Sequence, residues 1–112
     1  MEERKTLFVD VILPLPVHQE FTYRVPFEMN DLILEGIRVV VPFGKSKYYT
    51  AIVTKVHEKV PAEYVAKYVE YILDEKPIIT GKQYTFWKWI AKYYMAPIGD
   101  VLNAALPANF KL

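Results

Sequence analysis

The hydrophobic pattern of this chain changes its period near residue 80, and that change limits the possible folds more than any other feature of the sequence. Before it, apolar and polar residues alternate, which indicates strands with one buried face. Five such runs occur: Thr6–Leu13, Glu20–Val25, Ile37–Phe43, Tyr48–Val56 and Lys67–Leu73. Five short antiparallel strands predict a small, partly open barrel of the oligonucleotide-binding (OB) type, and an irregular β-sandwich fits nearly as well.

The fourth run carries a sign of curvature. Its apolar positions change parity between Ala51 and Val53 on one side and Ile52 and Val56 on the other. A strand does this when it contains a β-bulge or curls between two sheet surfaces. Curling favours the barrel over the sandwich.

After residue 80 the spacing of apolar residues becomes helical. Thr80 and Gln83 have the spacing of a capping box, in which the threonine hydroxyl accepts a hydrogen bond from a backbone N–H at the start of a helix. The residues expected on the apolar face are Tyr84, Trp87, Ile90, Ala91 and Tyr94. Lys88 and Lys92 lie opposite and should stay in water. We expect this helix to pack on the barrel.

A second, shorter helix should follow the first. Pro97 disfavours continuation of the first helix, and Asp100 is placed to cap a new one over Val101–Ala105. The sequence therefore predicts a mainly β fold with two C-terminal helices. The single domain should span residues 6–107, with a β part over 6–74 and a helical part over 80–106. Residues 1–5 and 108–112 are expected to be flexible ends.

Composition narrows the class of protein. At 112 residues and 53% hydrophobic content the chain can bury one compact core, and it contains nothing close to the roughly 18 consecutive apolar residues of a membrane span. Its charged start is unlike a secretory signal, and the absence of cysteine excludes disulfides and thiolate metal sites. We expect a cytoplasmic protein without membrane partners. The net charge of +1 excludes electrostatic coating of nucleic acid, so any such binding should be local.

No catalytic arrangement emerges from the residues. The two histidines, His18 and His57, lie outside every recognised serine, zinc or phosphate-binding motif and are expected to be loop residues. We therefore expect a non-enzymatic domain that needs neither metal nor cofactor.

The segment Ile37–Lys45 is a first candidate for ligand binding. Its β-branched residues favour a strand, Pro42 cannot occupy a central hydrogen-bonded ladder, and Gly44 permits a positive φ and close approach of a ligand. Lys45 then adds a positive charge. The turn either simply ends the strand or faces an anion or nucleotide.

Residues Phe21, Thr22 and Tyr23 form a second candidate. Alternation places Phe21 and Tyr23 on one face of a strand and Thr22 on the other. The two rings are either core aromatics or a surface on which a base stacks, which is worth about 1–3 kcal/mol per base. The residues alone leave both uses open.

Three separated motifs resemble the N-terminal domain of primosomal protein N′, the PriA family of replication-restart helicases. They are Phe21-Thr22-Tyr23-Arg24-Val25-Pro26, the segment Gly36–Lys45, and Tyr93–Leu102 followed by Ala105-Leu106-Pro107. The resemblance runs from about Phe8 to Pro107. It implies a domain that recognises the 3′-OH end of the nascent leading strand at stalled or abandoned forks. The domain would thereby position the helicase for fork remodelling and for reloading of the replicative helicase.

The resemblance also implies site residues. Phe21, Thr22, Tyr23, Gly44 and Lys67 would form the site for the DNA 3′ end, with Lys45 or Lys67 against the preceding phosphate. Relatives often carry aspartate at the position of Thr22. The charged carboxylate of those relatives is therefore replaced by a neutral hydroxyl in this chain. Hydrogen bonds to neutral groups are about half as strong as those to charged groups.

The longer helicases of this family use ATP and bind zinc through cysteines. This chain has no cysteine and no Walker-type motif. The resemblance therefore places ATP, zinc, and contacts to primosome proteins and single-strand-binding protein in other parts of such helicases. The residues also leave an alternative function open: a protein-interaction module that binds a peptide on its aromatic barrel face.

Overall fold

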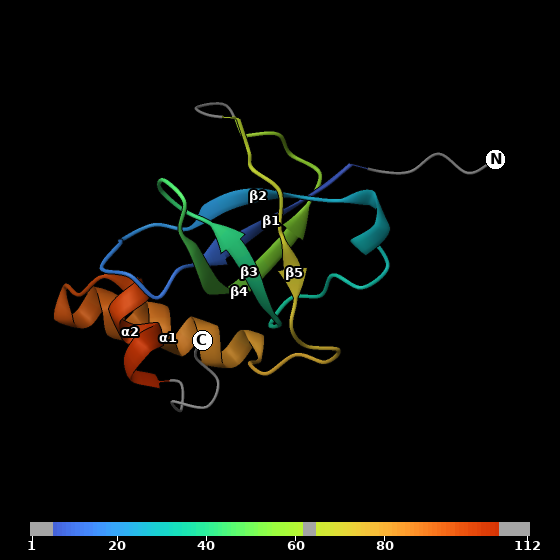
Figure 1. The fold of residues 1–112 in the computed structure, drawn as a ribbon. Helices are drawn as coiled ribbons and strands as arrows, with labels where there is room; N and C mark the ends of the chain where they lie inside the picture. Colours follow the sequence, from blue (N-terminus) through green and yellow to red (C-terminus); the bar gives the residue numbers. More distant parts are fainter. Residues whose placement is uncertain (1–5, 62–64, 106–112) are drawn as a thin grey trace.

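Figure 1 shows the fold in a computed structural model, which describes residues 6–61 and 65–105. The ends expected to be flexible, 1–5 and 108–112, lie outside the described residues. The elements are β1 (Leu7–Ile12), β2 (Phe21–Val25), a 3₁₀ helix η1 (Phe27–Met29), β3 (Arg38–Pro42), β4 (Tyr48–His57), β5 (Tyr71–Ile72), α1 (Gly81–Tyr94) and α2 (Ile98–Ala105). The predicted class, mainly β with two C-terminal helices, is confirmed.

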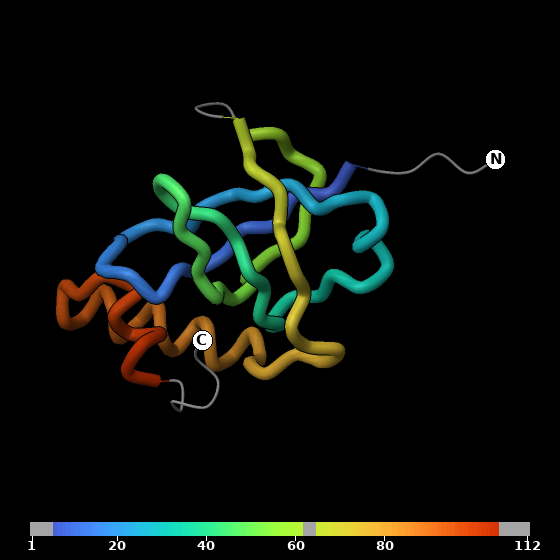
Figure 2. Tube along the Cα trace, viewed as in Figure 1, coloured from blue at the N-terminus to red at the C-terminus, as the bar shows by residue number. Residues whose placement is uncertain are grey.

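The five strands form one antiparallel sheet in the order β2-β1-β4-β3-β5. The sheet curls until β2 meets the residues that precede β5. The Arg24 N–H donates to the Lys67 carbonyl at 2.8 Å, and the Val69 N–H donates to the Arg24 carbonyl at 2.9 Å. Figure 2 shows the yellow segment before β5 crossing the front of the curled sheet. The architecture is therefore an OB-like half-barrel and not a sandwich.

A β-bulge in β4 contributes to this curvature. Asp10 of β1 is paired with Lys55, but the next residue, Val11, is paired with Val53, so Thr54 is an extra residue in β4. Such a bulge bends the strand and increases its twist. The predicted change of parity in this strand is confirmed.

The core has two layers. Inside the half-barrel the buried residues are Val9, Val11, Leu13, Tyr23, Val25, Ile33, Ile37, Val39, Val41, Ala51, Val53 and Val69. On the outer face of the sheet, Ile12 and Ile52 are paired across β1 and β4, and Trp87 of α1 and Leu102 of α2 cover them. Figure 1 shows both helices on one side of the sheet. The predicted packing of the first helix on the barrel is confirmed.

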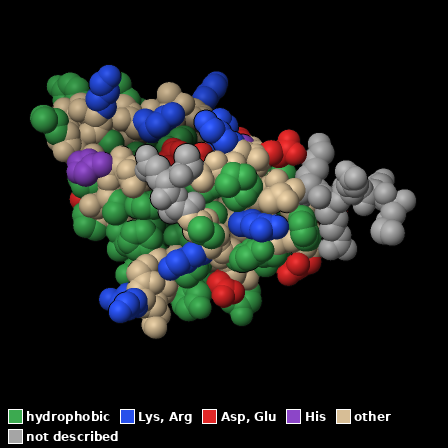
Figure 3. All heavy atoms as spheres, turned by 90° about the horizontal axis from the view of Figure 1, so that it is seen from above, with side chains coloured by type: hydrophobic (Ala, Val, Ile, Leu, Met, Phe, Trp, Pro, Cys, Tyr) green, Lys and Arg blue, Asp and Glu red, His purple; other side chains and the backbone are tan. Residues whose placement is uncertain are grey.

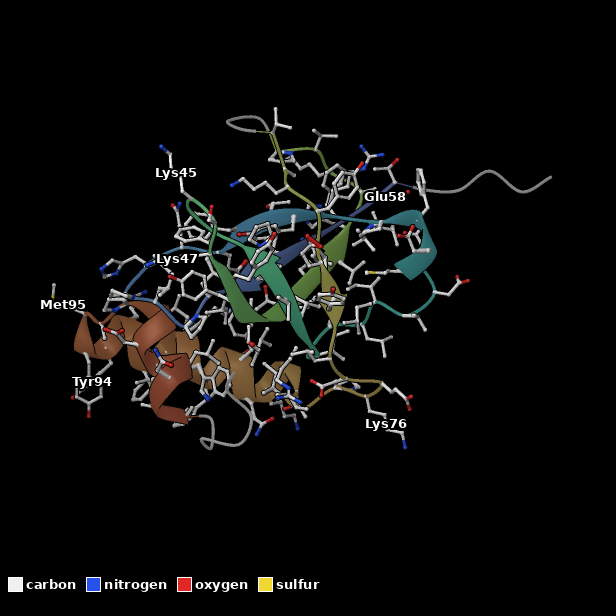
Figure 4. All side chains as sticks on the ribbon, in the orientation of Figure 1. Lys45, Lys47, Glu58, Lys76, Tyr94 and Met95 are labelled. Atoms are coloured by element: carbon white, nitrogen blue, oxygen red, sulfur yellow. The ribbon has the colours of Figure 1, made fainter. Side chains whose placement is uncertain are left out.

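Helix α1 begins at the predicted capping box. The Gln83 N–H donates to the Thr80 hydroxyl at 3.1 Å, and the Thr80 N–H donates to the Gln83 side-chain oxygen at 2.8 Å. Trp87 is buried, but Tyr94, predicted on the same face, is 69% exposed. The prediction for Tyr94 is wrong because the helix ends there and Met95, with a φ of 54°, turns the chain toward α2. Figure 4 shows both side chains projecting outward from the end of α1.

The outer face of α1 is more apolar than predicted. Phe86, Trp89 and Tyr93 are 57%, 55% and 66% exposed, beside the exposed Lys88 and Lys92. The three rings stack on one another, with successive centroid distances of 6.1 Å and 5.2 Å. Periodicity missed this stripe because aromatic residues occupy both faces of the helix.

Helix α2 begins at Ile98, three residues before the predicted start. The Pro97 carbonyl accepts hydrogen bonds from the N–H groups of Asp100 and Val101 at 3.0 Å and 3.3 Å. Asp100 therefore lies in the first turn, where its charge favours the positive end of the helix dipole, and not at the cap.

An ion pair joins β3 to the chain that follows β5. Arg38 donates to Asp74 through Nη2 at 2.8 Å and through Nε at 2.9 Å, and its backbone N–H donates to the same carboxylate at 2.9 Å. These hydrogen bonds hold the pKa of Asp74 below its ordinary value. Both side chains are largely buried, so the pair is part of the scaffold.

Candidate nucleic-acid interface

A cavity of about 340 Å³ lies beside β2, where three chain segments meet. Ligand-binding cavities usually hold about 300–1,000 Å³, so this one suits a small group. The residues that line it are Gln19, Phe21, Thr22, Tyr23, Pro42, Phe43, Gly44, Val65 and Lys67. The cavity therefore brings together five of the six predicted binding residues. The sixth, Lys45, is not in its lining.

The two aromatic residues of β2 offer different amounts of surface to this cavity. Tyr23 is only 4% exposed, and its hydroxyl donates to the Pro42 carbonyl at 2.7 Å. That hydrogen bond joins β2 to the end of β3, so it holds two walls of the cavity together. Phe21 is half-buried and packs edge-to-face against Phe43, with ring centroids 5.0 Å apart. Of the two rings, Phe21 retains the greater accessible surface.

The turn after β3 supplies the second wall. Gly44 has a φ of +75°, which confirms the predicted positive φ, and the Phe43 N–H donates to the Lys47 carbonyl at 3.0 Å across the turn. A Cβ added at Gly44 would meet no atom within 4 Å, so the turn borders open space. Figure 4 shows Lys45 extending outward from this turn.

The segment before β5 supplies the third wall. The Lys67 carbonyl accepts from the Arg24 N–H at 2.8 Å, and the Lys67 side chain is exposed. Arg24 in turn lies over the ring of Tyr68, 5.2 Å from its centroid. Backbone pairing thus fixes the Cα of Lys67, while its ammonium group stays in water and can meet an anion.

Sequence reasoning missed Asp10, which holds Thr22. The two residues are directly opposite in the pairing of β1 and β2, and the Thr22 hydroxyl donates to Asp10 Oδ1 at 2.7 Å. The same oxygen lies 2.9 Å from His57 Nε2. An acidic residue within the apolar run of β1 is the signal that could have revealed this contact.

The two histidines differ from each other in their setting. His18 lies in a loop, as predicted, but the same prediction for His57 was wrong, because β4 continues to this residue and pairs it with Phe8. Within residues 6–61 and 65–105, no group of three or more histidine, aspartate or glutamate side chains is placed to hold a metal ion.

Charges around the cavity are mixed. Figure 3 shows lysine and arginine side chains dispersed over one face, with acidic side chains among them. Glu20, next to Phe21, is half-buried; burial first and the charge of Asp10 second raise the pKa of its carboxyl group. Such a surface suits contact with a few phosphates and not with a long duplex.

Among the helices that the structure describes, none has the length and apolar character needed to cross a membrane.

Comparison with known proteins gives a consistent family match. The family model of the 3′ DNA-binding domain (3′BD) of PriA matches residues 10–107. The chain is 34% identical over 103 residues to replication restart protein PriA of Haemophilus influenzae, and 31% identical over 108 residues to the protein of the same name from Bacillus subtilis. These matches cover 92% and 93% of this chain but 14% and 13% of the relatives, so the chain spans about one seventh of their length.

Proposed function

Because the chain belongs to the 3′ DNA-binding domain family of PriA, we propose that it recognises the 3′-OH end of a nascent leading strand at stalled or abandoned replication forks. Recognition takes place in the cavity beside β2. The observation that carries this proposal is the meeting of Phe21, Gly44 and Lys67, which are far apart in the sequence, around one hollow of suitable size.

Each wall has a role in holding the terminal nucleotide. The base stacks on Phe21, whose ring is more accessible than that of Tyr23. The ribose lies against Gly44, where no side chain occupies the space. The ammonium group of Lys67 meets the phosphate that precedes the terminal nucleotide, and Lys45, just outside the lining, adds to the positive potential.

Thr22 accepts a hydrogen bond from the terminal hydroxyl. A threonine hydroxyl has one proton and two lone pairs, and the proton of Thr22 is directed to Asp10 at 2.7 Å. A hydroxyl that donates its proton can still accept through its oxygen lone pairs. A 3′-OH can donate to it, whereas a 3′-phosphate is largely dianionic at neutral pH and would bring negative charge toward Asp10.

A strand that continued past its 3′ carbon does not fit. The hydrogen bond between Tyr23 and Pro42 holds β2 against the end of β3, so the two walls cannot separate without losing it. In our proposal the next phosphate finds no room in a cavity of about 340 Å³. End recognition is thus a consequence of the limited volume of the cavity.

The whole protein would use this domain to direct other activities. The relatives are about seven times longer than this chain, and in our proposal the domain, over residues 6–107, positions a helicase for fork remodelling and for reloading of the replicative helicase. Contacts with primosome proteins and single-strand-binding protein, ATP hydrolysis and zinc binding would belong to the remaining parts. The domain itself would bind DNA in the cytoplasm, without enzymatic activity and without a cofactor.

The test is fluorescence anisotropy with two labelled oligonucleotides that differ only in ending with a 3′-OH or a 3′-phosphate. We expect the 3′-OH form to bind at least about tenfold more tightly, which corresponds to about 1.4 kcal/mol. Phe21→Ala should weaken binding of the 3′-OH form about fivefold or more, since base stacking contributes about 1–3 kcal/mol.

Phe86→Ala is the matched control, because Phe86 is an aromatic residue of α1 that is 57% exposed and outside the cavity. It should leave binding unchanged. Equal affinity for the two ends would rule out end recognition. An equal loss of affinity in Phe21→Ala and Phe86→Ala would show that the binding site does not lie in this cavity.

A further inference from the structure

A second and larger cavity, of about 610 Å³, lies on the other side of the segment that enters β2. It is a groove between the loop before β2 and one face of α1. His18 and Glu20 come from the loop, and Tyr84, Lys88 and Lys92 come from the helix. Nothing in the proposed recognition of the terminal nucleotide uses this groove.

The groove and the cavity beside β2 share one short segment as a common wall. Gln19 and Phe21 line the cavity, whereas His18 and Glu20 line the groove, so consecutive residues of one short segment alternate between the two hollows. Figure 2 shows this blue segment between the turn after β3 and the C-terminal end of α1. A polymer whose last unit occupies the cavity would reach the groove by crossing residues 18–21.

The helical wall of the groove is cationic. Helix α1 contains Lys82, Lys88 and Lys92 and no acidic residue, so its lysines are not neutralised within the helix. In the part of the chain that the structure describes, neither Lys88 nor Lys92 has an ion-pair partner within 4 Å. The ammonium group of Lys88 lies 4.6 Å from the ring centroid of Tyr84, which restricts its position at the groove.

One carboxylate opposes an anion in this groove. Glu20 is half-buried in its wall, and its pKa is raised, first by burial and then by the charge of Asp10. The side chains of Lys55 and Lys88 act on Glu20 in the opposite direction. Among the residues that line the groove, Lys88 and Lys92 outnumber the single acid, Glu20, so the lining retains a positive balance.

We propose that this groove is a second DNA subsite, in which Lys88 and Lys92 bind the phosphodiester backbone of the strand whose 3′-terminal nucleotide occupies the cavity beside β2. This inference rests on the proposed function, and it adds a direction: the strand leaves the cavity over residues 18–21 toward α1. The groove carries no sequence specificity, since it contacts backbone phosphates and not base edges.

The test compares a dinucleotide with an octanucleotide, both labelled at the 5′ end and both ending in a 3′-OH, on the wild-type chain and on Lys88→Ala/Lys92→Ala. The wild type should bind the octanucleotide more tightly than the dinucleotide. The double variant should lose about tenfold in octanucleotide affinity at low salt and should bind the dinucleotide as the wild type does. Loss of two phosphate contacts should also reduce the slope of log affinity against log salt by about 1.4.

The matched control is Lys76→Ala/Lys82→Ala, which removes the same charge from exposed positions outside the groove. In this control, the changes in octanucleotide affinity and in the salt slope should each be less than half of those in Lys88→Ala/Lys92→Ala. Glu20→Gln should strengthen octanucleotide binding, because it removes the opposing carboxylate. Circular dichroism of each variant should match that of the wild type.

Three outcomes overturn the inference: equal affinity of the wild type for the two lengths, equal losses in the two double variants, or loss of dinucleotide binding in Lys88→Ala/Lys92→Ala. Failure of the proposed function has a different signature. In that case an octanucleotide with a 3′-phosphate would bind the wild type as tightly as the 3′-OH form, while the lysine variant would still lose affinity for both.

Discussion

The turn at Gly44 and the start of α2 at Gly99 use glycine for opposite reasons. A Cβ added at Gly99 would collide with the carbonyl oxygens of Leu15 and Leu13, because α2 packs directly against the chain that follows β1. A Cβ added at Gly44 would meet no atom within 4 Å, and only the φ of +75° favours glycine there. One glycine is required by packing and the other by backbone conformation.

This difference separates a scaffold from a binding surface. Where α2 meets the chain after β1, the packing has no room for one more carbon atom, so this contact has a single arrangement. The side that carries the cavity leaves space beside the backbone, which a ligand can fill. Substitutions should therefore cost stability at the contact of α2 with the chain after β1, and DNA affinity at the cavity.

Gly99→Ala should give the largest loss of stability. The added methyl group would force α2 away from the chain after β1, and such overpacking against backbone costs about 3 kcal/mol. Urea unfolding measures the change in the free energy of unfolding. Gly81→Ala is the control, since the same atom meets nothing within 4 Å at the exposed start of α1 and should leave stability equal or higher. A loss below about 1 kcal/mol at Gly99 would show that α2 can shift freely.

Asp74→Asn should cost about 2–3 kcal/mol at pH 7, because it leaves the largely buried Arg38 guanidinium without its charged partner. The pKa of Asp74 is lowered in the folded state, so the stabilisation is complete above the unfolded value of about 3.9 and is lost as pH falls through the folded value. Urea midpoints of wild type and variant should therefore converge below about pH 4.

DNA affinity at 25 °C should be unchanged in Asp74→Asn, as this pair belongs to the scaffold and does not line the cavity. A variant that remained folded but lost DNA binding would contradict this distinction between scaffold and binding surface.

The elements that follow from local chemistry could be predicted from the sequence. The strands, the bulge at Thr54 and the capping box at Thr80 depend on alternation and on spacings of a few residues. Tyr94 was misplaced because a helical pattern does not reveal where tertiary packing ends. The aromatic stripe around Trp89 was missed for a related reason: periodicity does not say which of two apolar faces meets the sheet.

The candidate site depended on register and closure, which local patterns do not contain. The contact of Thr22 with Asp10 requires the pairing of β1 with β2, and that pairing depends on the length and path of the loop between them. The approach of Lys67 to Phe21 requires the curled sheet to meet the segment before β5. Among the arguments from sequence, only the family resemblance predicted that these residues form one site.

Thr22→Asp should destabilise the chain by about 1–2 kcal/mol at neutral pH, since two carboxylates would face each other across β1 and β2. The repulsion should disappear as acid protonates one of them, so the loss relative to wild type should shrink between pH 7 and pH 4. Thermal unfolding across this range measures the effect. Thr22→Asn, neutral and similar in size, should show no such pH dependence, and an equal dependence in both would exclude charge repulsion as the cause.

The smallest effects on stability are expected at Gly44, where strain and contact can be separated. Gly44→Ala should cost about 1 kcal/mol, because alanine is strained at a positive φ although nothing obstructs its methyl group. Gly44→Asn should cost less, since asparagine tolerates this region of backbone space, yet it adds the larger side chain.

If the space beside Gly44 holds the terminal ribose, the two variants should rank in opposite order in two measurements. Gly44→Ala should lose more stability in urea unfolding, and Gly44→Asn should lose more affinity for a 3′-OH oligonucleotide in fluorescence anisotropy. The same order in both would mean that affinity at this turn follows backbone strain, so the open space would have no part in binding. The opposite order would show that glycine is retained here for the ligand as well as for the turn, in contrast to Gly99, where the protein itself fills the space.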